Sequence, residues 1–275
     1  MEYFTTAAGI TVHLYDTVDR NSEVKDKKTI ILLHGYLETM YIWMEFANLL
    51  KNSYRVILMD MPGHGLTDSA PADEKGESIN TMDFCADVVK GVMDKCNIEK
   101  ACIGGHSMGG FIAQNCCIRY PEKFEKLIIF NSTPYKDKEE KTADRLREIE
   151  AIRKGKLETL AFISIPKMYC QENLRKFDDK IRETVELCET HFPEGIIASL
   201  KGMMSRGDTQ ELLKNATLPI LHFSGDCDPY LPQETLNTMM NDFSKVKFVN
   251  FKNTGHNSFI EAEKECYEQL CEFIC

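Results

Sequence analysis

Short apolar runs alternate along this chain with longer stretches in which apolar residues recur at helical spacing. The runs are rich in Ile, Leu and Val and do not alternate strictly with polar residues, which is typical of strands covered on both faces of a parallel sheet. Strand–helix alternation of this kind predicts right-handed βαβ units in an α/β fold with a doubly wound, mostly parallel sheet. We predict strands at 29–33, 55–59, 100–104, 126–130, 219–223 and 246–251, and helices at 81–96, 107–119, 233–243 and 258–274.

Two segments depart from this alternation. Residues 2–15 predict an antiparallel hairpin at one edge of the sheet, with its turn near Ala8-Gly9. Residues 134–215 lack a clear buried strand, and such a span is too long for a structureless loop in a compact domain. We therefore expect a helical insertion at 134–215 between two strands of a core that comprises 1–133 and 216–275. Amphipathic helices are expected within it at 144–154, 173–190 and 193–205.

The composition is that of an ordinary globular protein. The 275 residues are 43% apolar and 28% charged, and the net charge is −10. A negative charge of this size opposes binding to phosphate backbones and to anionic lipid surfaces, so neither nucleic acid nor a membrane is an expected partner. The mixed run from Lys25 to Lys28 is expected as a solvent-exposed loop before a strand.

The cysteines favour a reducing compartment. There are 11 of them, scattered and without a C-x-x-C pair, so we expect free thiols, no disulfide framework and no metal site. Residues 1–10 lack the features of a signal peptide, and no apolar run approaches the roughly 20 residues needed to cross a bilayer. The expectation is a cytoplasmic protein.

One motif indicates covalent catalysis. Gly105-His106-Ser107-Met108-Gly109 is a G-x-S-x-G sequence between a predicted strand and a predicted helix. Small residues two positions before and after the serine let the backbone turn sharply, so that the hydroxyl projects clear of the sheet. The helix that follows points its N–H groups and dipole at developing negative charge. Ser107 is therefore the predicted nucleophile.

The predicted oxyanion hole uses two backbone N–H groups. The strand at 29–33 leads into His34-Gly35-Tyr36, where a glycine lets the chain turn beneath a substrate carbonyl. The N–H of Tyr36 and that of Met108 are expected to converge on one oxygen.

A base and an acid must complete the site, because a serine hydroxyl is a poor nucleophile until its proton is taken. Of the seven histidines, His256 lies in the loop between the last strand and the last helix, where catalytic groups of such sheets are found. His222 lies within an apolar strand and is expected as a core residue. Asp226 and Asp228 both follow a strand, and spacing alone favours neither as the acid.

These motifs together resemble the α/β-hydrolase superfamily, in the group of capped esterases, lactonases and carbon–carbon bond hydrolases. The matching pieces, in the family's order, are His34-Gly35, Asp60–Asp68, Gly105–Gly110, Gly225–Pro232 and Gly255-His256. The resemblance selects Asp228, the last residue of a G-x-x-D pattern, over Asp226. It also implies that 134–215 is a cap over the pocket and that the 60–68 stretch is structural. Serine at the elbow argues against dehalogenases and most epoxide hydrolases, which carry aspartate there.

The resulting functional prediction is a cofactor-free serine hydrolase that acts on a small molecule as a monomer or homodimer. Its leading substrate is a small carboxylic ester, thioester or lactone. One alternative is carbon–carbon cleavage of a β-diketone-like acid by the same triad, and another is a ligand-binding protein with slow or no turnover. The residues expected to contact substrate are Gly35, His106, Phe162, Met168 and Tyr169. Four arginines, at 145, 147, 153 and 206, are candidates for binding a substrate carboxylate.

Overall fold

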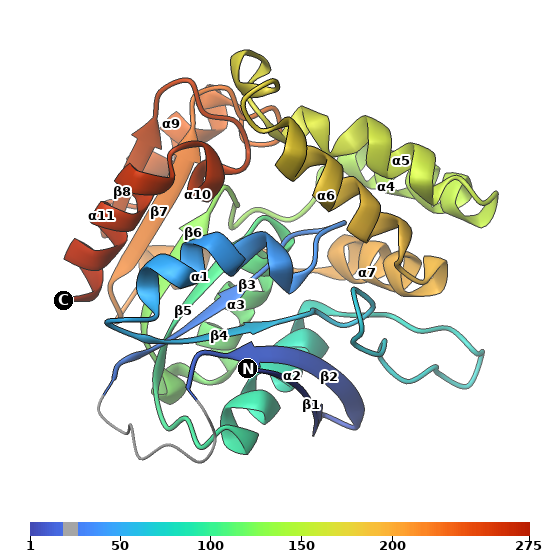
Figure 1. The fold of residues 1–275 in the computed structure, drawn as a ribbon, viewed down its shortest axis with the longest axis horizontal. Coiled ribbons are helices and arrows are strands. Elements are labelled where there is room, and N and C mark those ends of the chain that lie inside the picture. Colours follow the sequence, from blue (N-terminus) through green and yellow to red (C-terminus); the bar gives the residue numbers. More distant parts are fainter. Residues whose placement is uncertain (19–26) are drawn as a thin grey trace.

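The computed structural model describes residues 1–18 and 27–275, and it contains a single sheet in the order β1-β2-β4-β3-β5-β6-β7-β8 (Figure 1). Lys25 and Asp26 of the expected solvent-exposed loop lie outside the described residues. The β1–β2 hairpin turns at Ala8 and Gly9 and pairs antiparallel with β4, whereas the strands from β3 to β8 are parallel. The predicted fold class is confirmed. The strands are β1 (Glu2–Ala7), β2 (Ile10–Asp16), β3 (Thr29–Leu33), β4 (Arg55–Met59), β5 (Ala101–His106), β6 (Phe124–Phe130), β7 (Ile220–Gly225) and β8 (Val246–Phe251).

Helices cover both faces of the sheet. Along β3, Ile30 and Leu32 pack into one apolar cluster while Ile31 and Leu33 pack into the other, because successive side chains of a strand point to opposite faces. The first cluster contains side chains of α1 (Met44–Leu50), α10 (Ser258–Glu261) and α11 (Glu263–Ile274). The second contains those of α2 (Met82–Lys95), α3 (Met108–Arg119) and α9 (Gln233–Asp242).

Several predicted elements differ from the structure; β6 begins at Phe124 rather than at 126, and β7 ends at Gly225 rather than at 223. β5 continues to His106, since its ladder with β6 runs on to the pair His106–Phe130, although glycines at 104 and 105 weaken the strand pattern. α1 and the turn at Met40–Trp43 were not predicted. The helix expected at 258–274 is interrupted at Ala262, whose backbone leaves the helical region although the apolar spacing continues across it.

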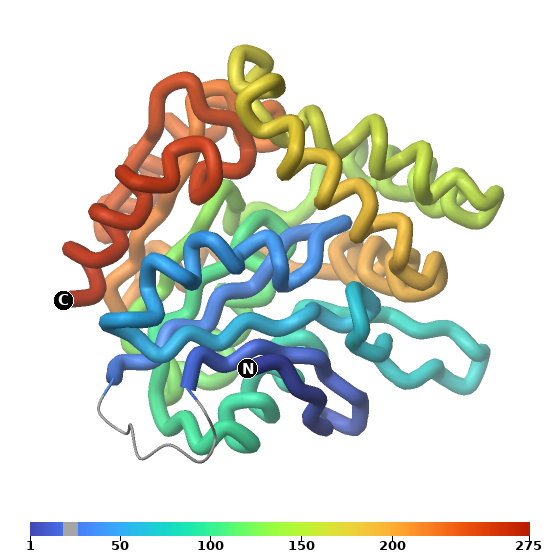
Figure 2. The backbone as a smooth tube through the Cα atoms, viewed as in Figure 1, coloured from blue at the N-terminus to red at the C-terminus, as the bar shows by residue number. Residues whose placement is uncertain are grey.

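The chain between β6 and β7 is helical (Figure 2). The predicted helices at 144–154, 173–190 and 193–205 correspond to α4, α6 and α7. Both α5 and the short α8 were missed; in α5 the large apolar residues Phe162 and Ile163 are exposed, so its sequence lacks a clean amphipathic stripe. The helices are α4 (Glu139–Arg153), α5 (Leu157–Ser164), α6 (Asp178–Glu189), α7 (Pro193–Ser205) and α8 (Gln210–Lys214), with short 3₁₀ turns at Pro166–Met168 and Gln171–Asn173.

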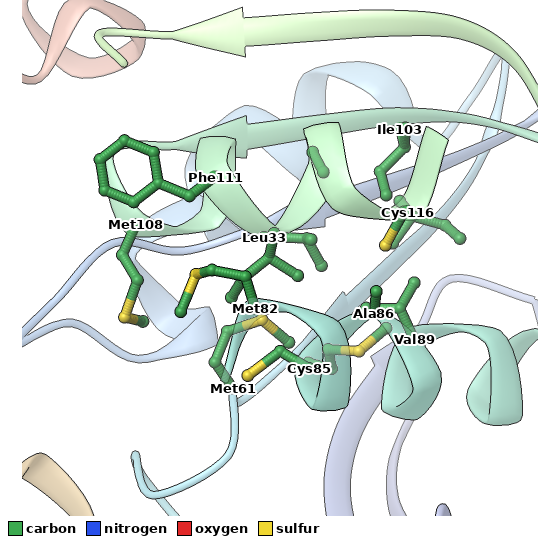
Figure 3. Close-up of a cluster of buried hydrophobic side chains, with 14 of the residues drawn as sticks. Leu33, Met61, Met82, Cys85, Ala86, Val89, Ile103, Met108, Phe111 and Cys116 are labelled. Carbon is green, nitrogen blue, oxygen red and sulfur yellow. The ribbon is translucent and has the colours of Figure 1, made fainter. Parts of the chain in front are cut away.

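A dense apolar cluster lies where β3 and β5 meet α2 and α3 (Figure 3). Leu33 and Ile103 come from the strands, Met82 and Val89 from α2, and Met108 from the first turn of α3. All of these side chains are buried. The packing therefore fixes the start of α3, where Met108 was predicted to offer its backbone N–H.

None of the helices in the described ranges has the length and apolar character that crossing a bilayer would require.

A buried carboxylate organises the loop after β4. Asp60 is 1% exposed; its Oδ1 accepts a hydrogen bond from Met40 N (2.8 Å), and its Oδ2 accepts from Leu66 N (3.1 Å) and His13 Nδ1 (2.8 Å). Burial opposes ionisation of Asp60, but the His13 hydrogen bond, the charge of His34 and the two backbone donors outweigh it and hold the pKa of the carboxyl below its usual range. This agrees with a structural role for the 60–68 stretch.

We expect Asp60→Asn to lower the free energy of unfolding by about 2–4 kcal/mol, because an amide cannot accept at both positions where the two carboxylate oxygens now do. Urea unfolding measures the change. Asp68→Asn is the matched control in the same loop, since Asp68 is exposed and accepts one backbone hydrogen bond from Thr11. Equal losses in the two variants would contradict this account of Asp60.

Candidate active site

Ser107 occupies a strained turn between β5 and α3. Its φ of 51° and ψ of −112° lie in the left-handed region that non-glycine residues rarely adopt. The flanking glycines are needed because a Cβ on Gly105 would lie 2.1 Å from Gly109 O, and one on Gly109 would lie 2.4 Å from Leu33 O. The G-x-S-x-G spacing thus reflects close backbone contacts on both sides of the serine.

Hydrogen bonds hold this turn in place. Ser107 N donates to Phe130 O (3.0 Å), while Ser107 O accepts from Gly110 N (2.9 Å) and from the hydroxyl of Ser132 (2.8 Å). A residue in such a sparsely populated φ/ψ region carries on the order of 1–3 kcal/mol of strain, so it keeps this conformation only where the surrounding contacts hold it there. Observed strain at a half-buried serine in front of a helix marks a candidate functional residue.

His256 is paired with Asp228. Its Nδ1 donates to Asp228 Oδ2 at 2.8 Å, and the two residues are 3% and 5% exposed. Of the two carboxylates left open by spacing, Asp228 is therefore the one that contacts the imidazole. Asp226 instead accepts from Thr254 N and lies 3.7 Å from the ammonium of Lys252.

The Asp228 carboxylate is held ionised. It also accepts from Asn131 Nδ2 (2.9 Å), Tyr230 N (2.8 Å) and Leu231 N (3.2 Å). Burial opposes ionisation, but the charge of His256 and these donors outweigh it and lower the pKa of Asp228. Because His256 Nδ1–H is committed to this carboxylate, Nε2 is the ring nitrogen left to take up a proton.

The His256 loop lies against the serine turn. His106, the residue before Ser107, donates from Nε2 to the His256 carbonyl (3.0 Å), and the centroids of the two rings are 4.8 Å apart. In the described part of the chain the Ser107 hydroxyl itself donates no hydrogen bond to His256. The residue before Ser107 thus contacts the loop that carries His256.

A buried carboxylate that sequence reasoning missed joins these loops. Glu38, 1% exposed, accepts from Gly35 N (2.6 Å) and from His106 Nδ1 (3.0 Å). Both partners of the His106 ring, Glu38 and the His256 carbonyl, are acceptors, so the ring donates to both only when both nitrogens carry protons. Burial opposes ionisation of Glu38, yet the charge and hydrogen bond of His106 lower its pKa. The only sequence signal was an acidic residue three positions after the turn glycine.

Two backbone N–H groups lie on the segments that meet at this junction. In the described residues, neither Tyr36 N–H nor Met108 N–H donates a hydrogen bond to the protein. A Cβ on Gly109 would lie 2.6 Å from His34 O, so the start of α3 packs directly on the chain that leads to Tyr36. Gly35, by contrast, uses its N–H on Glu38.

An open groove of about 860 Å³ adjoins the site. Its walls come from α4, α5, the turns around 166–173 and the loop after β7, and they include Lys141, Glu148, Tyr169 and Tyr230. The Tyr230 ring lies 4.8 Å from the His256 ring, so this end of the groove borders the imidazole. We name it the α4–α5 groove.

Only some of the predicted substrate contacts lie at or beside this groove. Tyr169 lines the α4–α5 groove, and Met168, 7% exposed, accepts a hydrogen bond from His256 N (2.6 Å) through its carbonyl. The expectation for Phe162 is corrected, because its side chain is 71% exposed on α5 and is not part of the groove wall. The expectation for His106 is also corrected, since its ring is fully buried with both nitrogens engaged by the protein.

The four candidate arginines are committed to carboxylates of the protein. Arg145 and Arg206 both pair with Asp137, at 2.6 and 2.7 Å, while Arg147 pairs with Asp144 and Arg153 pairs with Glu150. Lys141 and Lys167 line the α4–α5 groove and were missed by sequence reasoning. The Lys141 ammonium lies 5.3 Å from the Tyr230 ring centroid, burial lowers its pKa, and within the described residues it forms no ion pair.

Over residues 1–18 and 27–275, no three His, Cys, Asp or Glu side chains are grouped closely enough to hold a metal ion.

Comparisons with known proteins support the resemblance to α/β-hydrolases. The family profile described as alpha/beta hydrolase fold matches residues 28–149. The chain is 28% identical over 251 residues to pimeloyl-[acyl-carrier protein] methyl ester esterase of Legionella pneumophila, covering 89% of this chain and 94% of that protein. It is 35% identical over 120 residues to 2-hydroxy-6-oxo-6-phenylhexa-2,4-dienoate hydrolase of Comamonas testosteroni, covering 42% of this chain and 40% of that one.

Solved structures agree on the fold. An esterase from Thermogutta terrifontis superposes with a TM-score of 0.88 at 24% identity, covering 100% of this chain and 98% of that chain. The chain has the α/β-hydrolase fold, and the prediction that it is an enzyme of this type is confirmed.

We expect Glu38→Gln to lower the free energy of unfolding by about 3 kcal/mol at neutral pH, because it leaves a buried His106 without its anionic partner. Since the folded-state pKa of Glu38 is lowered, its stabilising contribution is present above the ordinary carboxyl pKa of 4.5 and is lost as the pH falls toward the folded-state value. Denaturant unfolding of wild type and variant across pH checks both points.

Glu45→Gln is the control for this experiment, since the Glu45 side chain on α1 is 70% exposed. The difference in free energy of unfolding between wild type and Glu38→Gln should shrink as the pH falls. If this difference stayed constant or grew, the assignment of Glu38 as a buried carboxylate would be contradicted.

Proposed function

We propose that this α/β-hydrolase cleaves a small carboxylic ester, thioester or lactone through an acyl-enzyme on Ser107, with His256 as base and Asp228 as the acid that orients it. The observation that carries the proposal is the 2.8 Å hydrogen bond from His256 Nδ1 to a buried, ionised Asp228, on a loop that contacts His106, the residue before a serine at positive φ. Nucleophile, base and orienting acid are the minimum set for activating a serine hydroxyl.

The reaction begins when Ser107 Oγ attacks the substrate carbonyl and His256 Nε2 takes its proton. Asp228 keeps Nδ1–H in place and stabilises the imidazolium without itself being protonated. His256 then protonates the leaving group, and water activated by the same nitrogen clears the acyl-enzyme. The contact between Ser107 and His256 is expected to tighten when substrate binds, as catalytic hydrogen bonds often do.

The free N–H groups of Tyr36 and Met108 are assigned to the oxyanion. Each lies in a fixed backbone: Tyr36 follows a glycine held by Glu38, and the Met108 side chain is packed in the apolar cluster beneath α3. Donors that need no reorganisation stabilise the tetrahedral intermediate, at about 2.7–4 kcal/mol for each donor in comparable sites.

The substrate is assigned to the α4–α5 groove, beneath a cap formed by residues 134–215. The groove ends at Tyr230 beside His256, and its walls combine the aromatic rings of Tyr169 and Tyr230 with the ammonium of Lys141. The ester class is favoured over carbon–carbon cleavage because the esterase relative aligns over 94% of its length, whereas the dienoate hydrolase aligns over 40%.

Hydrolysis of p-nitrophenyl esters of increasing acyl length tests the nucleophile. Ser107→Ala should lower kcat by about four to six orders of magnitude at every chain length, because no other group can form the acyl-enzyme. Ser132→Ala, which removes the hydroxyl that donates to Ser107 O, should lower kcat far less. Full esterase activity in Ser107→Ala would contradict the proposal.

The choice of acid is tested by a matched pair of substitutions in one loop. Asp228→Asn should lower kcat by about 10⁴, since the amide favours the wrong tautomer of His256. Asp226→Asn, two residues away, should change kcat less than about tenfold, because Asp226 contacts Thr254 N and Lys252 instead. If Asp226→Asn had the larger effect, the acid would be misassigned.

A further inference from the structure

Two cysteines from distant parts of the chain meet at the rim of the site. Cys170 lies between the turns Pro166–Met168 and Gln171–Asn173, and Cys227 lies in the loop after β7, directly before Asp228. Their sulfur atoms are in hydrogen-bond contact at 2.8 Å. Both line the α4–α5 groove; Cys170 is 4% exposed and Cys227 is exposed.

Packing on both sides fixes this contact. Cys170 N donates to Glu261 Oε2 (2.8 Å), and Cys227 N donates to Thr254 O (2.8 Å). A Cβ on Gly255 would lie only 2.6 Å from Cys170 N, so the turn is pressed against the chain that carries His256. The two thiols therefore face each other across segments that are each anchored to the core.

We propose that Cys170 and Cys227 form an oxidation-controlled disulfide that ties the turn around 166–173 to the loop of Asp228. A disulfide needs its sulfurs at about 2.05 Å, so they must approach by less than about 1 Å, within the reach of small side-chain rotations. Neither cysteine is a lone thiol, because the exposed Cys227 has a resolving partner in contact.

The oxidant is a peroxide, and the step balances with two water molecules as products. The Cys227 thiolate attacks one oxygen of hydrogen peroxide, the O–O bond breaks, and a sulfenic acid and hydroxide form. The sulfur of Cys170 then attacks the Cys227 sulfur, the S–O bond breaks, and hydroxide leaves; the two thiol protons complete both waters. Two thiols lose two electrons, which reduce one peroxide.

The reaction should be slow at neutral pH and faster at alkaline pH. The hydrogen bond with Cys170, followed by partial burial, raises the pKa of the Cys227 thiol to about 12, and only the thiolate attacks peroxide. Oxidation is therefore best followed at about pH 8.5 over hours rather than seconds.

The bond would restrain the groove next to the base. Met168 lies two residues before Cys170 and its carbonyl accepts the hydrogen bond from His256 N, and Asp228 directly follows Cys227. A bulky ester that separates the segments of Cys170 and Cys227 as it enters should therefore be turned over at least several-fold more slowly by the oxidised protein. This second part rests on the proposed function, whereas formation of the disulfide does not.

The test is to treat the folded full-length protein with hydrogen peroxide, block remaining thiols and map peptides by mass spectrometry. We expect the protein mass to fall by two hydrogens and one cross-linked pair of peptides, containing Cys170 and Cys227, to appear. Dithiothreitol should reverse both changes. Cys170→Ser and Cys227→Ser should each abolish it, while Cys275→Ser, at another exposed cysteine, should not. Tm should rise by about 5 °C or more in the cross-linked wild type, because the bond joins residues 57 positions apart.

Several results would overturn the proposal. Formation of the disulfide would be contradicted if peroxide left both thiols unlinked, linked other cysteines, or oxidised Cys227 alone irreversibly. The peptide map of the wild-type protein decides this even if a serine variant does not fold. A cross-linked protein with unchanged kcat/KM for long-chain esters, on an enzyme active toward them, would remove the second part. Absence of any esterase activity would contradict the proposed function, but it would not affect the test of disulfide formation by peptide mapping.

Discussion

The buried contact between Glu38 and His106 connects the three chain segments that meet at the site. Glu38 binds the turn after β3 through Gly35 N–H, and His106 belongs to the serine turn. The other nitrogen of His106 reaches the carbonyl of His256. Both Gly35 N–H and His106 Nδ1 donate to the same buried oxygen of Glu38, Oε2, so removing the carboxylate would leave two buried donors without an acceptor. The proposed oxyanion donors, nucleophile and base all lie on the segments that this contact connects.

Much of this arrangement follows from local chemistry that can be predicted from sequence. The parallel strands were evident because they are short apolar runs buried on both faces, and β3, β4 and β8 begin and end where predicted. The serine turn was evident because glycines at 105 and 109 have no tolerable substitute in so close a packing. Asp228 needed the family resemblance, since spacing treated it and Asp226 alike; only the folded loop shows which carboxylate points at the imidazole.

Other features depend on contacts between distant residues and leave no local pattern. Glu38 and Asn131 bind groups 68 and 97 positions away, and a single polar residue in an apolar stretch does not reveal its partner. Phe162 fitted an apolar pocket by composition, yet α5 turns it outward. Arginines 145 and 206 were candidates for a substrate carboxylate, but both pair with Asp137, and the ammonium groups at the groove come from Lys141 and Lys167 instead.

Site-specific labelling with a fluorophosphonate tests the central claim most directly, because the reagent reacts with a serine only when a base and an oxyanion hole already surround it. The account predicts one adduct on the folded protein, at Ser107, which disappears when the protein is unfolded before labelling. No adduct on folded protein, or an adduct at another serine, would contradict it.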